Sequence, residues 1–145
     1  MRFVTFELDG ARFGVPERDV VAISRAVLIA PLPRAPAIVE GVVDLHGAIV
    51  PVLDVRARFG LPPRALSASD HFVFVRAAAM AGPRALRVDR ALDLIELDDI
   101  ADVRDLPYVE HVAGVARSPD GLVLVHDVAT FLSEAEQLAL ADALA

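Results

Sequence analysis

One segment of the sequence occurs twice, and this repeat limits what the chain can fold into. Residues 113–132, AGVARSPDGLVLVHDVATFL, repeat residues 40–59, EGVVDLHGAIVPVLDVRARF. Both copies contain Gly-Val, a turn with glycine, an aliphatic run, Asp-Val and a phenylalanine. Two copies about 70 residues apart are too few and too widely spaced for a solenoid, so the repeat predicts two similar β subdomains packed together.

Two stretches have the pattern of paired strands. Residues 3–8 alternate between opposite faces, and the Asp9-Gly10 turn lets residues 11–15 return as an antiparallel strand. Residues 42–55 are rich in β-branched side chains and are interrupted at His46-Gly47, which predicts two buried strands joined tightly. The pattern predicts further strands at residues 72–75, which are buried, and within the alternating stretch 85–97.

The segments between these strands are less regular. Residues 16–24 fit either a short helix or a bent strand. Three prolines in residues 31–36 exclude a central strand and predict a connector, and Pro36 is placed to begin a short turn of helix. Pro51 predicts a strand edge or a bulge. Residues 81–83, Ala-Gly-Pro, predict a turn.

The C-terminal residues predict a helix. Ser133 and Glu136 have the spacing of a capping box, which marks a helix start. Leu138, Ala141 and Leu144 fall on one side of that helix, so we expect this side to pack across both subdomains.

Composition excludes several classes of protein. Apolar residues make up 55% of the 145 residues, enough for a core, and the absence of cysteine excludes disulfides and thiolate chemistry. The net charge of −7, without a basic cluster, argues against nucleic acid as a partner. The N-terminus alternates polar and apolar residues, so we expect neither a signal peptide nor membrane insertion. These features predict a cytoplasmic protein.

The polar residues do not form a recognisable catalytic motif. The four histidines are scattered, and the sequence has no HExxH, GxSxG or glycine-rich phosphate motif. The acidic residues from Asp89 to Asp99 are typical of a solvated face. We therefore expect no enzyme activity, no catalytic residue, no metal and no cofactor. His46 is predicted to be a turn residue at an interaction surface, and the remaining histidines, His71, His111 and His126, are predicted to be structural.

Binding to another protein is the function that the apolar content favours. Two small barrels cannot bury every aliphatic side chain of so apolar a chain, and exposed apolar strips on a protein usually mark partner sites.

Nearly the whole chain resembles the CheW family. The span FVTFELDGARFGVPERDVVAI through LPRAPAIVEGVVDLHGAIVPVLDVRARFGLP is similar to the family pattern F-x-L-x-x-x-x-y-g-I followed by LP-x-x-P-x-x-I-x-G-V-x-N-L-R-G-x-I-x-P-V-x-D-L-R. Later, LRVDRALDLIEL resembles V-D-x-V-x-D-V-x-x-L, and GLVLVHDVATFLSEAEQ resembles L-I-L-x-D-x-x-x-L-L-x-x-x-E.

The resemblance implies an all-β domain over residues 1–145. It would contain two intertwined five-stranded SH3-like barrels, short helices and a C-terminal helix. Subdomain 1 would span roughly residues 12–66. Subdomain 2 would span roughly residues 67–132, with the N-terminal strand exchanged into it, and the helix would follow at 133–145.

The resemblance also implies a non-catalytic adaptor. It would join the cytoplasmic tips of chemoreceptors to the regulatory domain of a CheA-type histidine kinase, with the kinase contacts mainly on the first barrel. The groove between the subdomains would face the receptor, and its implied partner-binding residues are Val20, Ile23, His46, Ile49, Val88, Asp89, Ala91 and Leu94.

The chain departs from the family pattern at two places. Asp44-Leu45-His46-Gly47 replaces Asn-Leu-Arg-Gly, and Ala22 stands where a glutamate often precedes the isoleucine. Neutral histidine lacks the fixed fork of donors of arginine, so coupling through this corner would be weaker, pH-sensitive or aimed at a different partner. The alternatives are a divergent scaffold outside chemotaxis, a sensor with a ligand cavity between the barrels, and a metal-dependent enzyme with converging histidines. A fourth, a piece of a larger kinase or of an adaptor fused to a receiver domain, predicts kinase or receiver motifs, and this sequence has neither.

Overall fold

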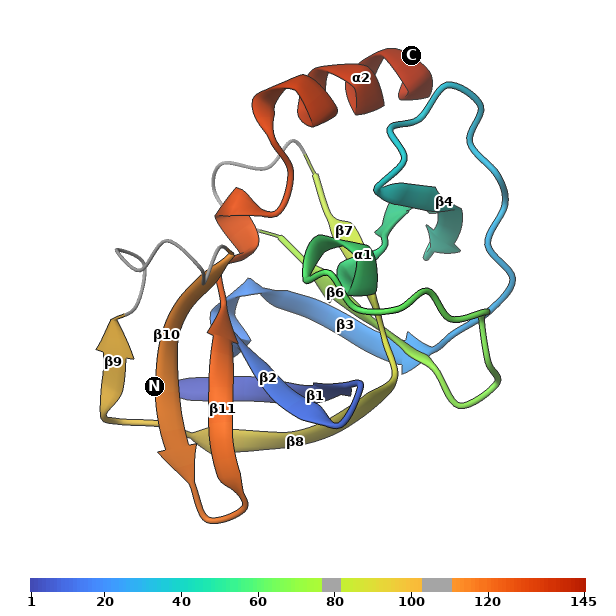
Figure 1. The fold of residues 1–145 in the computed structure, drawn as a ribbon. Coiled ribbons are helices and arrows are strands. Elements are labelled where there is room, and N and C mark those ends of the chain that lie inside the picture. The colour runs from blue at the N-terminus through green and yellow to red at the C-terminus, as the bar shows by residue number, and fades with distance from the viewer. Residues whose placement is uncertain (77–81, 103–110) are drawn as a thin grey trace.

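The computed structural model describes residues 1–76, 82–102 and 111–145 (Figure 1). Most of its regular elements are strands, as the sequence predicted. The strands are β1 (Arg2–Leu8), β2 (Ala11–Pro16), β3 (Val20–Arg25), β4 (Val39–Leu45), β5 (Ala48–Leu53), β6 (His71–Val75), β7 (Arg84–Val88), β8 (Arg90–Glu96), β9 (Ile100–Asp102), β10 (Val112–Ser118) and β11 (Gly121–His126). The helical elements are η1 (Glu17–Asp19), α1 (Val55–Arg58), η2 (Val128–Thr130) and α2 (Glu134–Leu144).

The strands form two sheets. The five-stranded sheet has the order β3-β6-β7-β5-β4, and the six-stranded sheet has the order β8-β1-β2-β11-β10-β9. Neighbours are antiparallel except for the parallel pairs β5–β7 and β2–β11. The predicted all-β fold with two subdomains and a C-terminal helix is confirmed, although β9 gives one sheet six strands instead of five.

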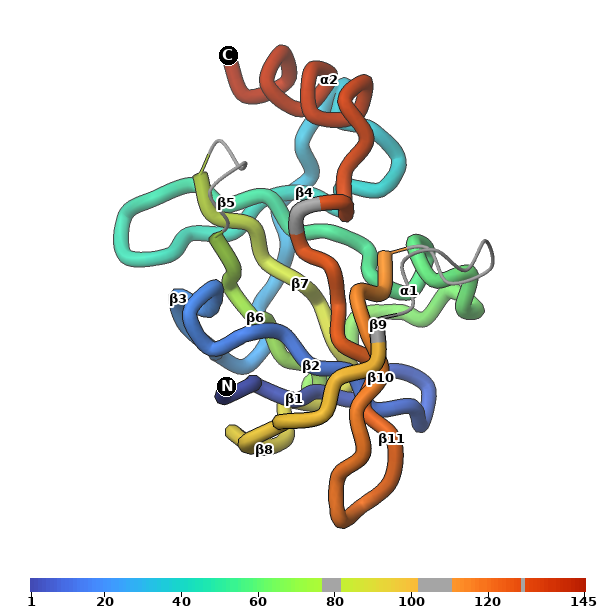
Figure 2. The backbone as a smooth tube through the Cα atoms, turned by 90° about the vertical axis from the view of Figure 1, so that its left-hand side faces the viewer, coloured from blue at the N-terminus to red at the C-terminus, as the bar shows by residue number. Residues whose placement is uncertain are grey.

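The chain passes between the sheets twice, and the two passages correct the predicted boundaries. After β1 and β2 it leaves the six-stranded sheet through η1, and after β7 it returns at Asp89. Strands β6 and β7, predicted to belong to subdomain 2, lie in the five-stranded sheet because β6 pairs with β3 and β7 pairs with β5. A whole hairpin, β1–β2, is therefore exchanged rather than one strand (Figure 2).

Buried side chains form three apolar clusters. One cluster lies on one face of the five-stranded sheet and includes Phe72 and Phe74. A second lies on one face of the six-stranded sheet and includes Phe3 and Val123. The largest, here called the central cluster, combines residues of both sheets, such as Val4 and Val73, with residues of α2. Aliphatic and aromatic side chains therefore fill the space between the sheets.

The registers of the two sheets match, as the sequence repeat predicted. The parallel pair Val52–Ala85 of one sheet corresponds to Val125–Gly14 of the other. A register shift lies before Gly41 in β4 and at the equivalent place before Gly114 in β10. The two halves therefore share one backbone plan, in which β3, β6, β7, β5 and β4 correspond to β8, β1, β2, β11 and β10.

The segments between the strands follow the sequence predictions only in part. The ambiguous residues 16–24 form η1 followed by β3, and residues 31–36 form the predicted connector. The prediction of a helix turn after Pro36 was wrong, because β4 already begins at Val39, which pairs with Leu53. Pro51 lies in an interior strand, but it pairs only with β4, since the ladder with β7 begins at the next residue. The predicted turn 81–83 falls partly outside the described residues.

The C-terminal helix forms with its capping box but with a different buried side. The Ser133 hydroxyl accepts from the Glu136 N–H, and the Glu136 carboxylate accepts from the Ser133 N–H. Leu140 is 1% exposed and Leu138 is 70% exposed, so the predicted packing side was wrong. The rotation is fixed by Glu136, four residues before Leu140, because the Nη2 of Arg58 in α1 donates to both of its carboxylate oxygens at 2.7 Å.

Candidate interaction surface

The β4–β5 hairpin presents two of the predicted partner-binding residues at its tip. His46 and Gly47 both have positive φ, 51° and 88°, as in a type I′ turn, and the Gly47 N–H donates to the Asp44 carboxylate. His46 is exposed at the turn. Ile49 is 62% exposed and pairs with Asp44. An aliphatic side chain and a carboxylate therefore stand together at this tip.

Two further predicted residues lie on the edge strands. Ile23 of β3 is 45% exposed and Leu94 of β8 is 50% exposed. Ile23 pairs with Val73 and Leu94 pairs with Val4, and both pairing partners belong to the central cluster. Directly paired residues share a face of the sheet, so both exposed side chains lie at the rim of the space between the sheets.

The start of β1 separates these two edge strands in both views (Figures 1 and 2). A surface hollow of about 330 Å³ lies there, lined by Met1, Arg2, Glu17 and Arg18. The two remaining predicted edge residues, Val20 and Ala91, are half-buried, and Val20 packs against the central cluster. The structure thus brings Val20, Ile23, Ala91 and Leu94 to the two edges that flank β1.

Val88 was wrongly assigned to the surface. Its side chain is 1% exposed and packs in the central cluster, because β7 is an interior strand covered by the other sheet. A partner cannot reach it in this fold.

Asp89 is largely engaged within the molecule. Its carboxylate accepts from Nη1 of Arg56 at 2.9 Å, from Nη2 of Arg64 at 3.2 Å and from the Asp9 N–H at 2.8 Å. Arg56 also binds the Asp9 carboxylate and the carbonyl oxygen of Pro62. These contacts join α1 of one half, the β1–β2 turn of the other half and the crossing at Asp89, so Asp89 holds the two halves together.

A second ionic cluster continues from this crossing. Arg87 binds Asp70 at 3.1 Å and Glu40 at 2.8 Å, and Arg64 also binds Asp70. Burial raises the pKa of Glu40, and its hydrogen bond with Arg87 offsets part of that effect. By contrast, Arg84 is buried and donates only to backbone carbonyls within the described residues, and burial lowers its pKa.

His126 is buried in an aromatic cluster. Its ring lies 5.3 Å from that of Phe59 and 5.1 Å from that of Phe131, measured between centroids. Neither ring nitrogen has a hydrogen-bond partner within the described residues. Burial, together with the charge of His111, lowers the pKa of His126 to about 3. The ring is therefore neutral near pH 7 and packs as a core side chain.

The histidines do not converge as a metal enzyme would require. His46 is on an exposed hairpin tip, whereas His126 ends β11 inside the core. Within the part of the chain that the structure describes, no three histidine or acidic side chains are placed to hold a metal. None of the helices among the described residues is long and apolar enough to cross a membrane.

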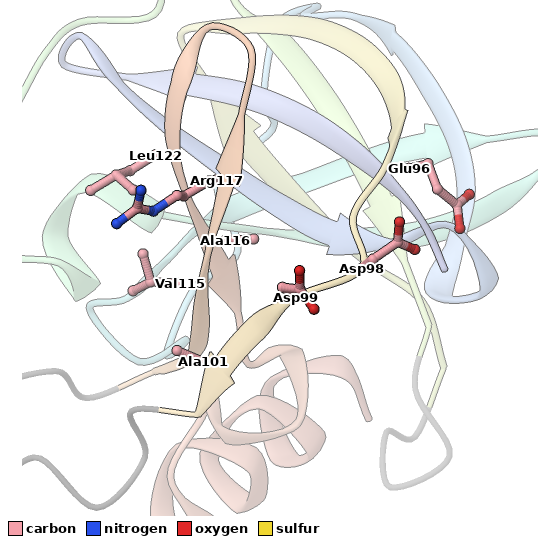
Figure 3. A pocket seen from close by; sticks show the side chains of 8 residues that line it. All are labelled: Glu96, Asp98, Asp99, Ala101, Val115, Ala116, Arg117 and Leu122. Carbon is pink, nitrogen blue, oxygen red and sulfur yellow. The ribbon is translucent and has the colours of Figure 1, made fainter.

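A larger hollow of about 590 Å³ lies on the six-stranded sheet (Figure 3). Figure 3 shows Asp98 and Asp99 on the segment between β8 and β9, and Arg117 and Leu122 on the β10–β11 hairpin. The hollow does not lie between the sheets, where a sensor was expected to hold its ligand. Its complete lining is Glu96, Asp98, Asp99, Ala101, Val115, Ala116, Arg117 and Leu122.

Sequence reasoning missed several exposed apolar residues. Leu122 is 60% exposed at the position equivalent to Ile49, so applying the repeat residue by residue could have found it. Val21 is exposed at the register shift of β3, and Leu28 is exposed in the connector after it. Nothing in the sequence pattern marks Leu28.

Comparisons with known proteins agree with this fold. The model of the family described as "CheW-like domain" matches residues 2–136. Chemotaxis protein CheW of Treponema pallidum is 28% identical over 149 residues, covering 97% of this chain and 87% of that protein. Protein FrzA of Myxococcus xanthus is 33% identical over 128 residues, covering 80% and 74%. The crystal structure of scaffolding protein TtCheW from Thermoanaerobacter tengcongensis superposes with a TM-score of 0.83 at 24% identity, covering 93% and 94%.

Proposed function

The chain belongs to the CheW-like domain family, and from this membership we propose that it is a non-catalytic adaptor that couples chemoreceptors to a CheA-type histidine kinase. The observation that carries the proposal is the exposure of Ile23, Leu94 and Ile49 on edge strands and a hairpin tip. These positions suit docking against another folded protein, because a strand edge and a hairpin tip project from the molecule.

The receptor tip docks along the edge strands. Ile23 and Leu94 supply the exposed apolar contacts, and Val20 and Ala91 form the more buried part of the surface. Full burial of an aliphatic side chain contributes roughly 1.5–3 kcal/mol, so covering a half-exposed one contributes about 1 kcal/mol. A few such contacts support a modest affinity, which suits reversible assembly. Asp89 contributes to this surface indirectly, because its ion pairs hold the two halves together.

The kinase regulatory domain docks on the five-stranded half. Ile49 provides the apolar contact there, and the Asp44 carboxylate and His46 flank it. His46 has no fixed guanidinium fork, so the contact at this corner depends more on Ile49 than on an ion pair. The adaptor works in the cytoplasm, where its partners lie, and its charge of −7 disfavours nucleic acid.

The test is a titration of the protein against the regulatory domain of a CheA-type kinase from the same cell at two salt concentrations. Ile49→Asp should abolish saturable binding, because it puts a charge into an apolar contact. His46→Arg should leave binding unchanged or strengthen it. Leu138→Asp is the matched control, since Leu138 is 70% exposed, against 62% for Ile49, and belongs to α2 instead of the hairpin. Absence of binding by the unmodified chain at high micromolar concentration would refute the adaptor role.

A further inference from the structure

The two edge strands occupy equivalent places in the two halves. In one half, Ile23 of β3 pairs with Val73 of β6, and in the other half, Leu94 of β8 pairs with Val4 of β1. These two pairs occupy equivalent places, so Ile23 corresponds to Leu94. Two residues later, Arg25 pairs with His71 and Glu96 pairs with Arg2. Arg25 therefore corresponds to Glu96. Equivalent positions of the two edge strands therefore carry an aliphatic side chain in both halves, but a cation in one half and an anion in the other.

Charges around each edge strand extend this difference. Near β3, the exposed Arg18, Arg25 and Arg76 have no carboxylate partner within the described residues. Two carboxylates are also close to this strand, but Glu17 is paired with Arg2 and Asp19 is half-buried.

Carboxylates predominate beside β8. Asp93, Asp98 and Asp99 are exposed, and none of them has a cationic partner in the described part of the chain. Glu96 is paired with the Met1 amine at 2.5 Å, and both groups are about half-exposed, so the net charge beside β8 comes from the three aspartates. The cation on β8, Arg90, is paired with Glu7. The β3 edge is therefore the basic one and the β8 edge is the acidic one.

Apolar contacts alone leave the orientation of a partner undecided. A segment lying across β1 would meet Ile23 on one side and Leu94 on the other, and turning it by 180° would preserve both contacts. Charges distinguish the two orientations, because a wrong pairing places like charges together and a right one places opposite charges together.

From this we infer that the partner segment that binds across β3 and β8 is apolar along its centre, acidic where it meets Arg25 and basic where it meets Glu96, so that it binds in one orientation. This inference rests on the proposed function, since it describes the chemistry of the same receptor-binding surface.

The experiment uses the full chain and a fragment of the cytoplasmic tip of a chemoreceptor from the same cell, labelled with a fluorophore at its tip. The chain has no cysteine, so Ser69→Cys gives a single labelling site for the second fluorophore. Ser69 is exposed and stands next to Asp70, whose carbonyl accepts from the Ala26 N–H at 2.9 Å, so the label marks the Arg25 end of β3. Energy transfer then reports the orientation of the bound fragment, and titration reports its affinity.

Arg25→Glu and Glu96→Arg should each weaken binding by roughly threefold to tenfold, the range for one or two exposed charge pairs. The exchange R25E/E96R should restore most of the affinity and change the energy transfer, because the fragment turns by 180° to match the inverted charges. Arg34→Glu is the control, since Arg34 is exposed in the connector after β3, and it should change neither readout.

Additive loss of affinity in the exchange variant, or unchanged energy transfer, would overturn the inference while leaving the adaptor role intact. Failure of the unmodified chain to bind the fragment, or full binding by I23D/L94D, would instead overturn the proposed receptor surface and the inference with it.

Discussion

The two halves of the molecule share a backbone plan but differ in the side chains at equivalent positions. Leu53 pairs with Leu86 at the end of β5, and the equivalent residue at the end of β11 is His126. At the hairpins, Asp44 stands opposite Ile49 and Arg117 stands opposite Leu122. These equivalent residues are buried or exposed alike in the two halves, but their side-chain chemistry differs. Duplicated backbone geometry thus places the surfaces, and side-chain divergence makes them distinct.

The two crossings between the sheets differ in the same way. The crossing from β7 to β8 is held by Arg56 and Asp89, whose side chains are 6% and 13% exposed. The crossing from β2 to β3 carries the pair Arg2 and Glu17, whose side chains are 61% and 39% exposed. Only the first pair is shielded from water and salt, so it should contribute most to holding the halves together.

Arg56→Met should have the largest effect on stability. It leaves the carboxylates of Asp89 and Asp9 without their guanidinium partner, and breaking a buried pair costs about 3–5 kcal/mol. The free energy of unfolding, measured by urea denaturation, reports the loss. Arg2→Met at the other crossing should cost at most about 1 kcal/mol. Equal losses in the two variants would mean that the two crossings contribute alike.

Gly41→Ala should destabilise more than the equivalent Gly114→Ala. A Cβ at Gly41 would lie 2.2 Å from the carbonyl oxygen of Ala30, and the φ of 150° is strained for alanine. At Gly114 the nearest atom is a side-chain methyl of Ile100, which can move more easily, and the backbone oxygen of Ala101 is farther away, at 2.9 Å. Overpacking costs about 1–3 kcal/mol and more where backbone must shift, so we expect about 3 kcal/mol or more for Gly41. Thermal unfolding of both variants checks the order.

The sequence predicted the strands and the duplication but not how the hairpins are shared. Alternation in residues 85–97 marks strands, yet long-range pairs such as Leu53–Leu86 decide which sheet β7 joins. The family resemblance placed Val88 on the surface, and alternation could not correct this, because it does not reveal which face another sheet covers. For α2, Leu138 and Leu140 are equally apolar, and a tertiary contact of Glu136 decides which one is buried.

The candidate surface was predictable where turn chemistry and pattern are local. His46-Gly47 marks a tight turn in the sequence, and the structure exposes Ile49 two residues beyond it. Ile23 and Leu94 are exposed because they lie on edge strands, and edge position is a property of the whole sheet. Asp89 gives no sequence signal of its buried pairing, because Arg56 is 33 residues away.

His126→Leu should stabilise the protein, since it makes this half resemble the half with Leu53. The change removes two buried ring nitrogens that have no hydrogen-bond partner among the residues described by the structure, and we expect a gain of roughly 1–2 kcal/mol. The pH dependence gives a sharper readout. Because the folded pKa of about 3 is below the ordinary value of 6.5, the unfolded state takes up the proton first, and stability falls as pH drops below about 6.5.

When the pH falls from 7 to 5, this histidine should lower the unfolding free energy of the unmodified chain by about 2 kcal/mol. The unfolding free energy of His126→Leu should fall by about 2 kcal/mol less over the same range. Urea denaturation at both pH values measures the difference. His71→Leu is the control, because His71 lies on β6 and is only half-buried, whereas His126 is fully buried. Identical pH profiles for His126→Leu and the unmodified chain would show that the imidazole is already charged or paired in the folded state.

The smallest effect expected is at α2, which is attached to the two halves by different contacts. Glu136 receives two hydrogen bonds from Arg58 of the five-stranded half, and the same guanidinium lies 5.7 Å from the ring of Phe131, which follows the six-stranded half. Glu136→Gln keeps the shape and part of the cap but removes the charge, so we expect a loss of about 1 kcal/mol.

Acid should reproduce this loss in the unmodified chain. Burial raises the pKa of Glu136, but the hydrogen bond from the Ser133 N–H and the charge of Arg58 outweigh it, so the folded pKa is lowered. The stabilisation is therefore complete above the ordinary glutamate pKa and is lost as pH falls through the lower folded pKa. In Glu136→Gln, the free energy of unfolding should lack this pH-dependent contribution. A loss of the whole fold in Glu136→Gln, seen by circular dichroism, would mean instead that docking of α2 is required for the central cluster to form.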